Sequence, residues 1–171
     1  MKYILTLLLS SSLSFASIDA LKSFEANFTQ TITDDKKKSL VYEGHIVASA
    51  PQNALWNYYK PIKKDVYINR FRVVIVEPEI EQVIIRNIES DFDFFRMIKS
   101  AKKINENTYE AKYRESRFII TINKDIIESI SYIDEFENNV KIIFSNQEQN
   151  KKIDKKIFIP KYPLDFDVIR D

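Results

Sequence analysis

The sequence is informative first in what it lacks. Its 171 residues include no cysteine, one glycine and one histidine. Without cysteine there is no disulfide, thiolate nucleophile, iron–sulfur cluster or cysteine-type zinc site. A single glycine excludes the glycine-rich phosphate and dinucleotide loops and the Gly-x-Ser-x-Gly nucleophile elbow. One histidine cannot build an all-histidine metal site, so we predict neither a metal nor a cofactor.

Charge of either sign is not in excess. Lys and Arg total 26 against 25 for Asp and Glu, a net charge of +1, so nucleic acid is not an expected partner. No pair of carboxylates stands out by its pattern, and we predict that the chain is not an enzyme. Hydrophobic residues make up 44% and aromatic residues 13%, which suffices for the packed core of one domain.

The first sixteen residues have the features of a secretory signal peptide. Met1-Lys2 supplies the positive end, residues 3–15 are uncharged and mostly apolar or serine, and Ser14 and Ala16 are small residues at the positions that a signal peptidase reads. The apolar run is shorter than the ~20 residues that span a bilayer, and no cysteine is present to accept a lipid. We therefore predict a signal peptide over 1–16 and a single exported, soluble domain over 17–171.

The domain begins with a mixed pattern and continues as a series of strands. Ile18, Leu21, Phe24 and Phe28 follow helical spacing, which predicts a short helix over 17–28 that feeds a strand, because apolar and polar residues alternate from about Phe24 onward. Residues 34–38 form a polar hairpin turn. Runs rich in Ile, Val, Tyr and Thr between polar turns predict further strands over 40–48, 54–59, 65–68, 71–76, 82–88, 108–114, 117–122, 127–133 and 140–145.

One later stretch has helical periodicity. Ser90 is a helix N-cap candidate followed by acidic residues, and positive charges gather toward the other end. Between them Phe94, Met97, Ile98 and Ala101 repeat at helical spacing, which predicts an aromatic helix over about 91–101. An antiparallel meander of nine or ten strands must close or cover its apolar concave face. Covered tightly, that face is an ordinary core, whereas loose packing gives a pocket with a lid.

Five segments in one order carry a family resemblance. They are Ser23-Phe24-Glu25-Ala26-Asn27-Phe28-Thr29-Gln30, then Glu43-Gly44-His45-Ile46, then Pro51 with Leu55-Trp56 and Pro61, then Glu77-Pro78 through Glu81-Gln82-Val83, and last Ile157-Phe158-Ile159-Pro160 with Phe166-Asp167-Val168. Together they resemble LolA, the family of periplasmic outer-membrane lipoprotein carriers. The resemblance spans nearly the whole of the expected mature chain.

This resemblance implies a fold and a function. The fold would be mainly β with an α lid, a single antiparallel and strongly curved unclosed β-barrel covering two or three short helices. The protein would be a periplasmic monomer that shelters the acyl chains of lipoproteins, receives them from an inner-membrane ABC transporter and passes them to an outer-membrane acceptor. Exposing one acyl chain to water would cost on the order of 10 kcal/mol. An exported β-domain that binds another lipid, or that senses or binds a protein, is the alternative.

Strand alternation selects the side chains expected to line a cavity. With Phe28 facing inward, alternation also turns Ala48 and Val140 inward. The predicted lipid-binding residues lie on this inward face and are Phe28, Ile32, Tyr42, Ile46, Trp56, Tyr58, Val73, Ile75, Phe118, Ile120, Ile142 and Phe144. The expected lid residues are Phe92, Phe94, Phe95 and Ile98. Plain core packing is the alternative for each of them.

The lone glycine and the lone histidine are adjacent. Gly44 either permits a bulge or a close backbone approach or leaves volume for a ligand. Glu43 and His45 flank it and could form an acid–base or metal pair, but alternation places both on the solvent face, so we expect surface cross-strand pairs.

The chain also departs from the family pattern. Ala50 stands where the family often has a basic residue thought to latch the lid, Ala54 replaces an aromatic residue, and Asn69-Arg70 replaces an Asp-Gly turn. Apolar contacts are then expected to set the lid equilibrium.

Overall fold

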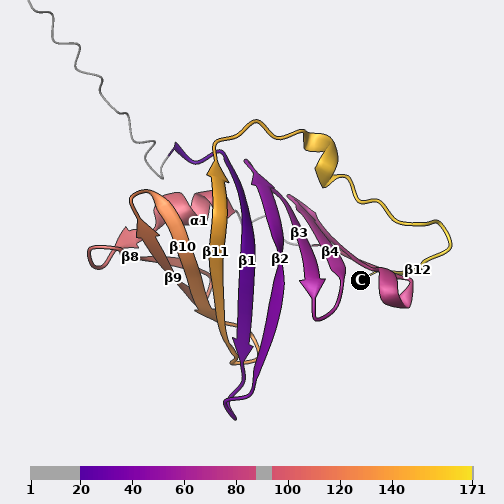
Figure 1. The fold of residues 1–171 in the computed structure, drawn as a ribbon, viewed down its shortest axis with the longest axis horizontal. Coiled ribbons are helices and arrows are strands. Elements are labelled where there is room, and N and C mark those ends of the chain that lie inside the picture. Colours follow the sequence, from indigo (N-terminus) through magenta and orange to yellow (C-terminus); the bar gives the residue numbers. More distant parts are fainter. Residues whose placement is uncertain (1–19, 88–93, 171) are drawn as a thin grey trace, which may run out of the picture.

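A computed structural model describes residues 20–87 and 94–170, which form one twelve-stranded sheet (Figure 1). The strands are β1 (Ser23–Thr33), β2 (Ser39–Ser49), β3 (Asn53–Lys60), β4 (Lys64–Asn69), β5 (Arg72–Glu77), β6 (Gln82–Asn87), β7 (Lys102–Lys103), β8 (Thr108–Tyr113), β9 (Ser116–Asn123), β10 (Ile126–Ile133), β11 (Asn139–Gln149) and β12 (Asp167–Arg170). Their order is β12-β6-β5-β4-β3-β2-β1-β11-β10-β9-β8-β7. The two end strands, β12 and β7, do not pair with each other, so the sheet is unclosed.

The predicted strands after residue 38 are all present, with ends shifted by a few residues. The strand expected from about Phe24 is confirmed, since β1 begins at Ser23, and the helical spacing of residues 17–28 therefore does not continue as a helix past residue 22. Phe24, Ala26 and Phe28 are all buried, so a two-residue period on the inner face prevails over the helical spacing that the same residues also fit.

The expectation of a purely antiparallel sheet also needs correction. Strand β12 pairs with β6 in parallel, whereas every other neighbouring pair is antiparallel. The chain reaches this edge by a long segment after β11 that includes the 3-10 helix η3 (Lys155–Phe158), and this crossover brings β12 alongside β6 in the same direction. Neither β12 nor the two-residue β7 was predicted, since both are short.

Helix α1 (Phe94–Ser100) lies within the predicted helix, behind β10 and β11 in Figure 1. It buries Phe95, Met97 and Ile98. The described residues hold this one α-helix together with η3 and a 3-10 turn, η2 (Pro78–Ile80). The predicted signal peptide, the candidate cap Ser90 and the expected lid residue Phe92 lie outside the described residues.

Two separate apolar clusters cover the two faces of the sheet. The concave cluster joins β1, β2 and β8–β11 to α1 and includes Leu21, Phe24 and Ile120, none of which is exposed. The convex cluster joins β2–β6 to Phe158 of η3, with Tyr162 and Phe166 of the C-terminal segment packed against it. The C-terminal segment therefore serves as the cover of the convex face.

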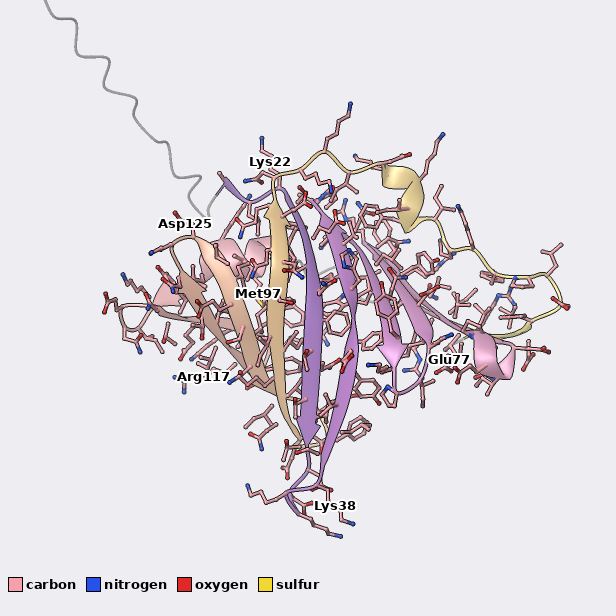
Figure 2. The ribbon with its side chains drawn as sticks, viewed as in Figure 1. Lys22, Lys38, Glu77, Met97, Arg117 and Asp125 are labelled. Atoms are coloured by element: carbon pink, nitrogen blue, oxygen red, sulfur yellow. The ribbon has the colours of Figure 1, made fainter. Side chains whose placement is uncertain are left out.

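The sheet has two distinct ends. At the hairpin end lie the turns 34–38, 61–63 and 134–138, since Thr33 pairs with both Ser39 and Asn139. Figure 2 shows Lys38 at this end and Lys22 at the opposite end of β1. The opposite end is the α1 end, because the Phe94 ring of the helix lies 6.2 Å from the ring of Phe24 at the start of β1.

Gly44 is buried on β2 where the pairing with β3 shifts register. A Cβ atom there would lie 2.6 Å from Cζ of Phe28 and closer still to the carbonyl oxygen of Asn57. Both distances are too short for real atoms. The glycine therefore permits a close approach, to the next strand and to an aromatic ring, and leaves no free volume for a ligand.

We expect Gly44→Ala to lower the free energy of unfolding by about 1–3 kcal/mol, the usual range for overpacking, in urea denaturation. Val41→Thr, a change of an exposed residue on the same strand, should shift it by less than about 0.5 kcal/mol. Wild-type stability with a reduced capacity for apolar ligands would contradict this assignment.

Candidate functional site: an apolar cavity between the sheet and helix α1

The concave face holds a cavity of about 330 Å³. Its lining comes from both halves of the sheet and from α1, and comprises Gln30, Ile46, Ala48, Gln52, Asn53, Ala54, Trp56, Tyr58, Val66, Ile68, Phe94, Phe95, Met97, Phe118, Ile130, Tyr132 and Ile142. This volume falls near the lower limit of ligand pockets, which run from roughly 300 to 1,000 Å³. Most of these side chains are apolar, so the space suits hydrocarbon.

Phe24 anchors the α1 end of the cavity. Its ring meets Phe144 of β11 edge to face at 5.1 Å and Phe94 of the helix at 6.2 Å. The Phe94 ring in turn meets Phe95 at 5.4 Å. Phe95 is 3% exposed, whereas Phe94 is only partly buried. Ring contacts thus join the helix to the start of β1.

An aromatic row forms one wall. The ring of Phe28 lies edge to face with Trp56 at 5.0 Å and with Tyr58 at 5.1 Å. Tyr58 also meets Tyr42 at 5.6 Å. These contacts follow from register, because Phe28 faces Gly44, which faces Tyr58 on β3. The absence of a side chain at Gly44 lets the Phe28 ring reach across to β3.

The cavity is polar at the hairpin end. The Tyr58 hydroxyl donates a 3.0 Å hydrogen bond to Oε1 of Gln30, a residue only 8% exposed. Burial raises the pKa of Tyr58, and the nearby Tyr132 and Tyr42 hydroxyls raise it further. Burial, and then Asp134, raise the pKa of Tyr132. Both tyrosines therefore remain protonated at any physiological pH.

A lysine borders this polar end. Lys64 Nζ lies 4.6 Å from the ring centre of Tyr58 and 5.1 Å from that of Tyr42. Both distances are within the range of cation–π attraction. The contact places a positive charge beside the aromatic row, on the strand that follows it.

A wider surface hollow, of about 1320 Å³, lies at the hairpin end, and most of its lining, such as Thr31, Ser131 and Lys141, comes from the outer face of the sheet. Its lining includes Arg117, Asp134 and Lys141, and it shares Tyr132 with the cavity. The hollow and the cavity therefore lie mainly on opposite faces of the sheet.

The structure places the predicted site residues in three groups. Ile46, Trp56, Tyr58, Phe118, Ile142, Phe94 and Phe95 line the cavity. Phe28, Ile32, Ile120, Phe144, Val140 and Ile98 pack in the concave cluster around it. Tyr42, Val73 and Ile75 are partly buried and do not line it. Val73 and Ile75 pair with Ile68 and Val66, so they share the cavity face but lie farther toward the sheet edge.

Sequence reasoning did not select several lining residues. Met97 belongs to the apolar face of the predicted helix but not to the expected lid residues. Val66 and Ile68 lie in a predicted strand, and pairing with β3 puts them opposite Trp56 and Ala54. That register could have identified them. Tyr132 and Gln30 are polar, and hydrophobic alternation passes over such residues.

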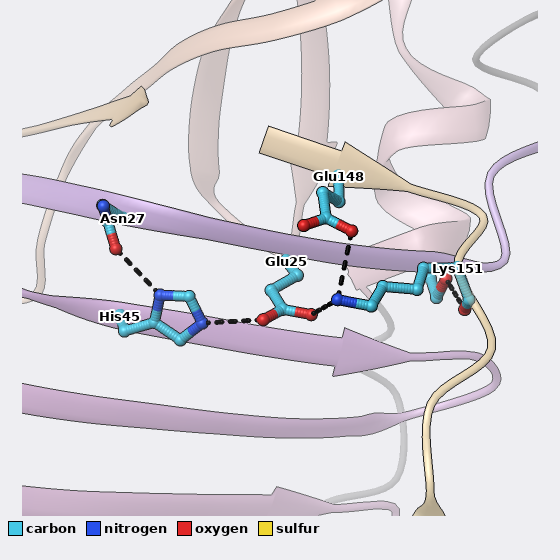
Figure 3. A network of polar contacts seen from close by, with 6 residues as sticks. Glu25, Asn27, His45, Glu148 and Lys151 are labelled. Carbon is cyan, nitrogen blue, oxygen red and sulfur yellow. Dashed lines mark hydrogen bonds and ion pairs between the residues drawn. The ribbon is translucent and has the colours of Figure 1, made fainter. Parts of the chain in front are cut away.

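The polar network around His45 lies on the opposite, outer face (Figure 3). Nδ1 of His45 is 2.9 Å from Oδ1 of Asn27, and Nε2 is 3.2 Å from Oε1 of Glu25. Lys151 Nζ then lies 3.3 Å from Glu25 and 3.0 Å from Glu148, and these two carboxylates raise the pKa of Lys151, with Glu148 the larger influence. The network ties β1 to β2 and to the start of the C-terminal segment.

Glu43 does not join this network. Its carboxylate pairs instead with Lys60 on β3 at 2.9 Å. The prediction of surface cross-strand pairs for residues 43 and 45 is therefore confirmed, with partners on different strands.

No cluster of His, Asp and Glu in the described ranges 20–87 and 94–170 has the three members needed to hold a metal ion. Within the same ranges no helix has the length and apolar character to cross a membrane. The chemistry that the arrangement offers is the sheltering of hydrocarbon, together with hydrogen bonding at one end.

Comparison with known proteins agrees with this geometry. Residues 19–93 match the family model described as outer membrane lipoprotein carrier protein LolA. An outer-membrane lipoprotein carrier protein of Campylobacter jejuni is 40% identical over 86% of this chain and 86% of its own. One from Wolinella succinogenes is 33% identical over 93% of both chains.

The fold has a counterpart among solved structures as well. An uncharacterized conserved protein from Thermus thermophilus superposes with a TM-score of 0.56 at 11% identity, over 93% of this chain and 96% of that one. That similarity concerns the fold alone. The sequence relatives decide the family, since identities of 33–40% extend over most of each chain. The chain belongs to the LolA family of outer-membrane lipoprotein carrier proteins.

Proposed function

We propose that this protein carries lipoproteins across the periplasm by sheltering their acyl chains in the cavity between the sheet and α1. The observation that carries the proposal is an apolar, ligand-sized cavity of about 330 Å³ in a member of a carrier family. A signal peptide over residues 1–16 would export the chain, and an inner-membrane ABC transporter would load it, because the single-glycine sequence offers no nucleotide-binding loop. The protein performs no chemistry on its cargo.

Burial of hydrocarbon supplies the binding energy. Each methylene group removed from water contributes about 0.8 kcal/mol, so one acyl chain of ordinary length provides on the order of 10 kcal/mol. The cavity holds roughly one small ligand, and a larger lipid needs more room. Helix α1 is the element best placed to give it, since its buried side chains Phe95, Met97 and Ile98 pack against the concave face as apolar contacts.

Helix α1 thus acts as the lid, with Phe94, Phe95 and Ile98 as its contacts. Phe24 meets Phe94 of the helix, and Phe144 packs on Phe24 in the same cluster. The residue at the family's latch position, Ala50, packs against the same concave cluster, in keeping with a lid equilibrium set by apolar contacts. An outer-membrane acceptor would then receive the lipid once the lid opens.

The first prediction from this proposed function concerns release. Protein purified from the periplasm and incubated with inner membranes that contain the transporter and ATP should bring lipoproteins into the soluble fraction. Ala54→Trp fills the cavity and should reduce that release several-fold. Thr29→Trp adds the same side chain on the exposed face of β1 and should leave release unchanged.

No release by the wild-type protein, together with the extraction of a different bound lipid, would favour the alternative of another exported lipid-binding domain. Equal release by the Ala54→Trp and Thr29→Trp variants would contradict the assignment of this cavity.

The second prediction concerns the lid. Phe94→Glu introduces a carboxylate at a cavity-lining position of α1 and should weaken the binding of an environment-sensitive apolar dye by tenfold or more, because a charge buried beside hydrocarbon is costly. Circular dichroism should remain that of the wild type, since Phe94 is only partly buried. Lys99→Glu adds the same charge on the exposed side of the helix and should bind the dye normally. Dye binding by Phe94→Glu equal to that of Lys99→Glu would remove α1 from the site.

A further inference from the structure

The cavity is amphipathic along its length. Phe24, at the α1 end of β1, and Gln30, toward the hairpin end, both face inward and are separated by six residues, which corresponds to about 20 Å of extended strand. Around Phe24 the neighbours are aromatic rings. Around Gln30 they are hydroxyl groups, of which Tyr58 is hydrogen-bonded to it. A site for bare hydrocarbon has no use for such groups, because burying polar atoms is costly.

Two hydrogen-bond donors at the polar end have no acceptor within the described residues. Oε1 of Gln30 accepts from Tyr58, and this bond leaves the two N–H groups of the Gln30 amide unused. The Tyr132 ring packs on Phe118 at 5.0 Å, and its hydroxyl group makes no bond to the described part of the chain. Among the described residues, Oε1 of Gln147 is the only fully buried side-chain nitrogen or oxygen atom without a hydrogen-bond partner. The Gln30 amide nitrogen and the Tyr132 hydroxyl oxygen are therefore not fully buried. Both donors are thus reachable from the cavity.

We infer that Gln30, Tyr58 and Tyr132 form a polar subsite for the carbonyl groups through which acyl chains join their polar head. The inference rests on the proposed function and adds a direction to it. Hydrocarbon points toward α1, the carbonyl oxygens accept hydrogen bonds from the Gln30 amide and the Tyr132 hydroxyl, and the head lies beyond them at the hairpin end.

The chemistry of the donors fits this ligand. A carbonyl oxygen accepts hydrogen bonds and cannot donate them. The Gln30 N–H and Tyr132 O–H groups are donors that lack an acceptor. Burial keeps the pKa of Tyr132 above its ordinary value, so the hydroxyl remains a donor. Lys64, held over Tyr42 and Tyr58, adds positive charge at the same end, which favours the oxygen-rich part of a lipid there.

The third prediction compares two lipids of equal chain length. Dipalmitoylglycerol has ester carbonyl groups, and dihexadecylglycerol has ether links in their place. Displacement of an apolar dye should show that the wild-type protein prefers the ester by about fivefold or more, the effect of a single net hydrogen bond. The variant that combines Gln30→Met with Tyr132→Phe keeps the side-chain volumes and should bring the ratio close to one. Tyr59→Phe alters an outward-facing tyrosine and should keep the wild-type ratio.

Each result separates the two levels of the proposal. If neither lipid binds the wild-type protein, the carrier function fails. If both bind with equal affinity, the cavity stands and the polar subsite is wrong. This wild-type comparison does not depend on any variant, so it holds even if the double variant does not fold. A ratio that the folded double variant leaves unchanged would also overturn the subsite.

Discussion

The structure depends on one contact between a backbone and a ring, that of Phe28 over Gly44. Because β2 has no side chain there, the ring of Phe28 reaches across it and meets Trp56 and Tyr58 on β3. Those contacts orient Tyr58 so that its hydroxyl bonds Gln30 on the strand from which Phe28 itself comes. The aromatic wall and the polar end of the cavity thus follow from the same missing Cβ. The single glycine of the chain thus stands at a position where even a Cβ atom would be too close to its neighbours.

The strands and the inward faces were predictable from sequence, and the cavity was not. Alternation in β1 and β11 identifies Phe28, Ile142 and Phe144 as inward-facing, because each strand has one apolar side. Whether an inward side chain lines a cavity or packs against another side chain depends on the distance between sheet and helix. The periodicity of the sequence does not reveal that distance. Ile46 lines the cavity and Ile120 does not, yet the two occupy equivalent places in their own strands.

The errors share a physical cause. Phe24 and Phe28 satisfy both a helical and a two-residue spacing, and the pairing of β1 with two long neighbours decides for the strand. Strand β12 was not foreseen because four residues carry too short a pattern, and its parallel pairing comes from the crossover before it. Alternation places Gln30 on the same side of β1 as Phe28, and its burial agrees. A pattern of apolar residues nevertheless does not select a polar side chain such as Gln30 or Tyr132 as cavity lining.

The two covers of the sheet differ in how firmly they are attached, and this has a consequence for mechanics. The C-terminal segment is fixed at both ends, by the Glu25–Lys151 pair and a hydrogen bond from Ser23 to the carbonyl of residue 151 at its start, and by the β12–β6 ladder at its finish. Helix α1 has seven residues and packs Phe95, Met97 and Ile98 into the concave cluster. Free energies of local unfolding vary within one domain. Here the value for the C-terminal segment on the convex face would exceed the value for helix α1 on the concave face. The convex side is then the more rigid of the two, so an increase in the volume of the interior would displace the helix rather than the C-terminal segment.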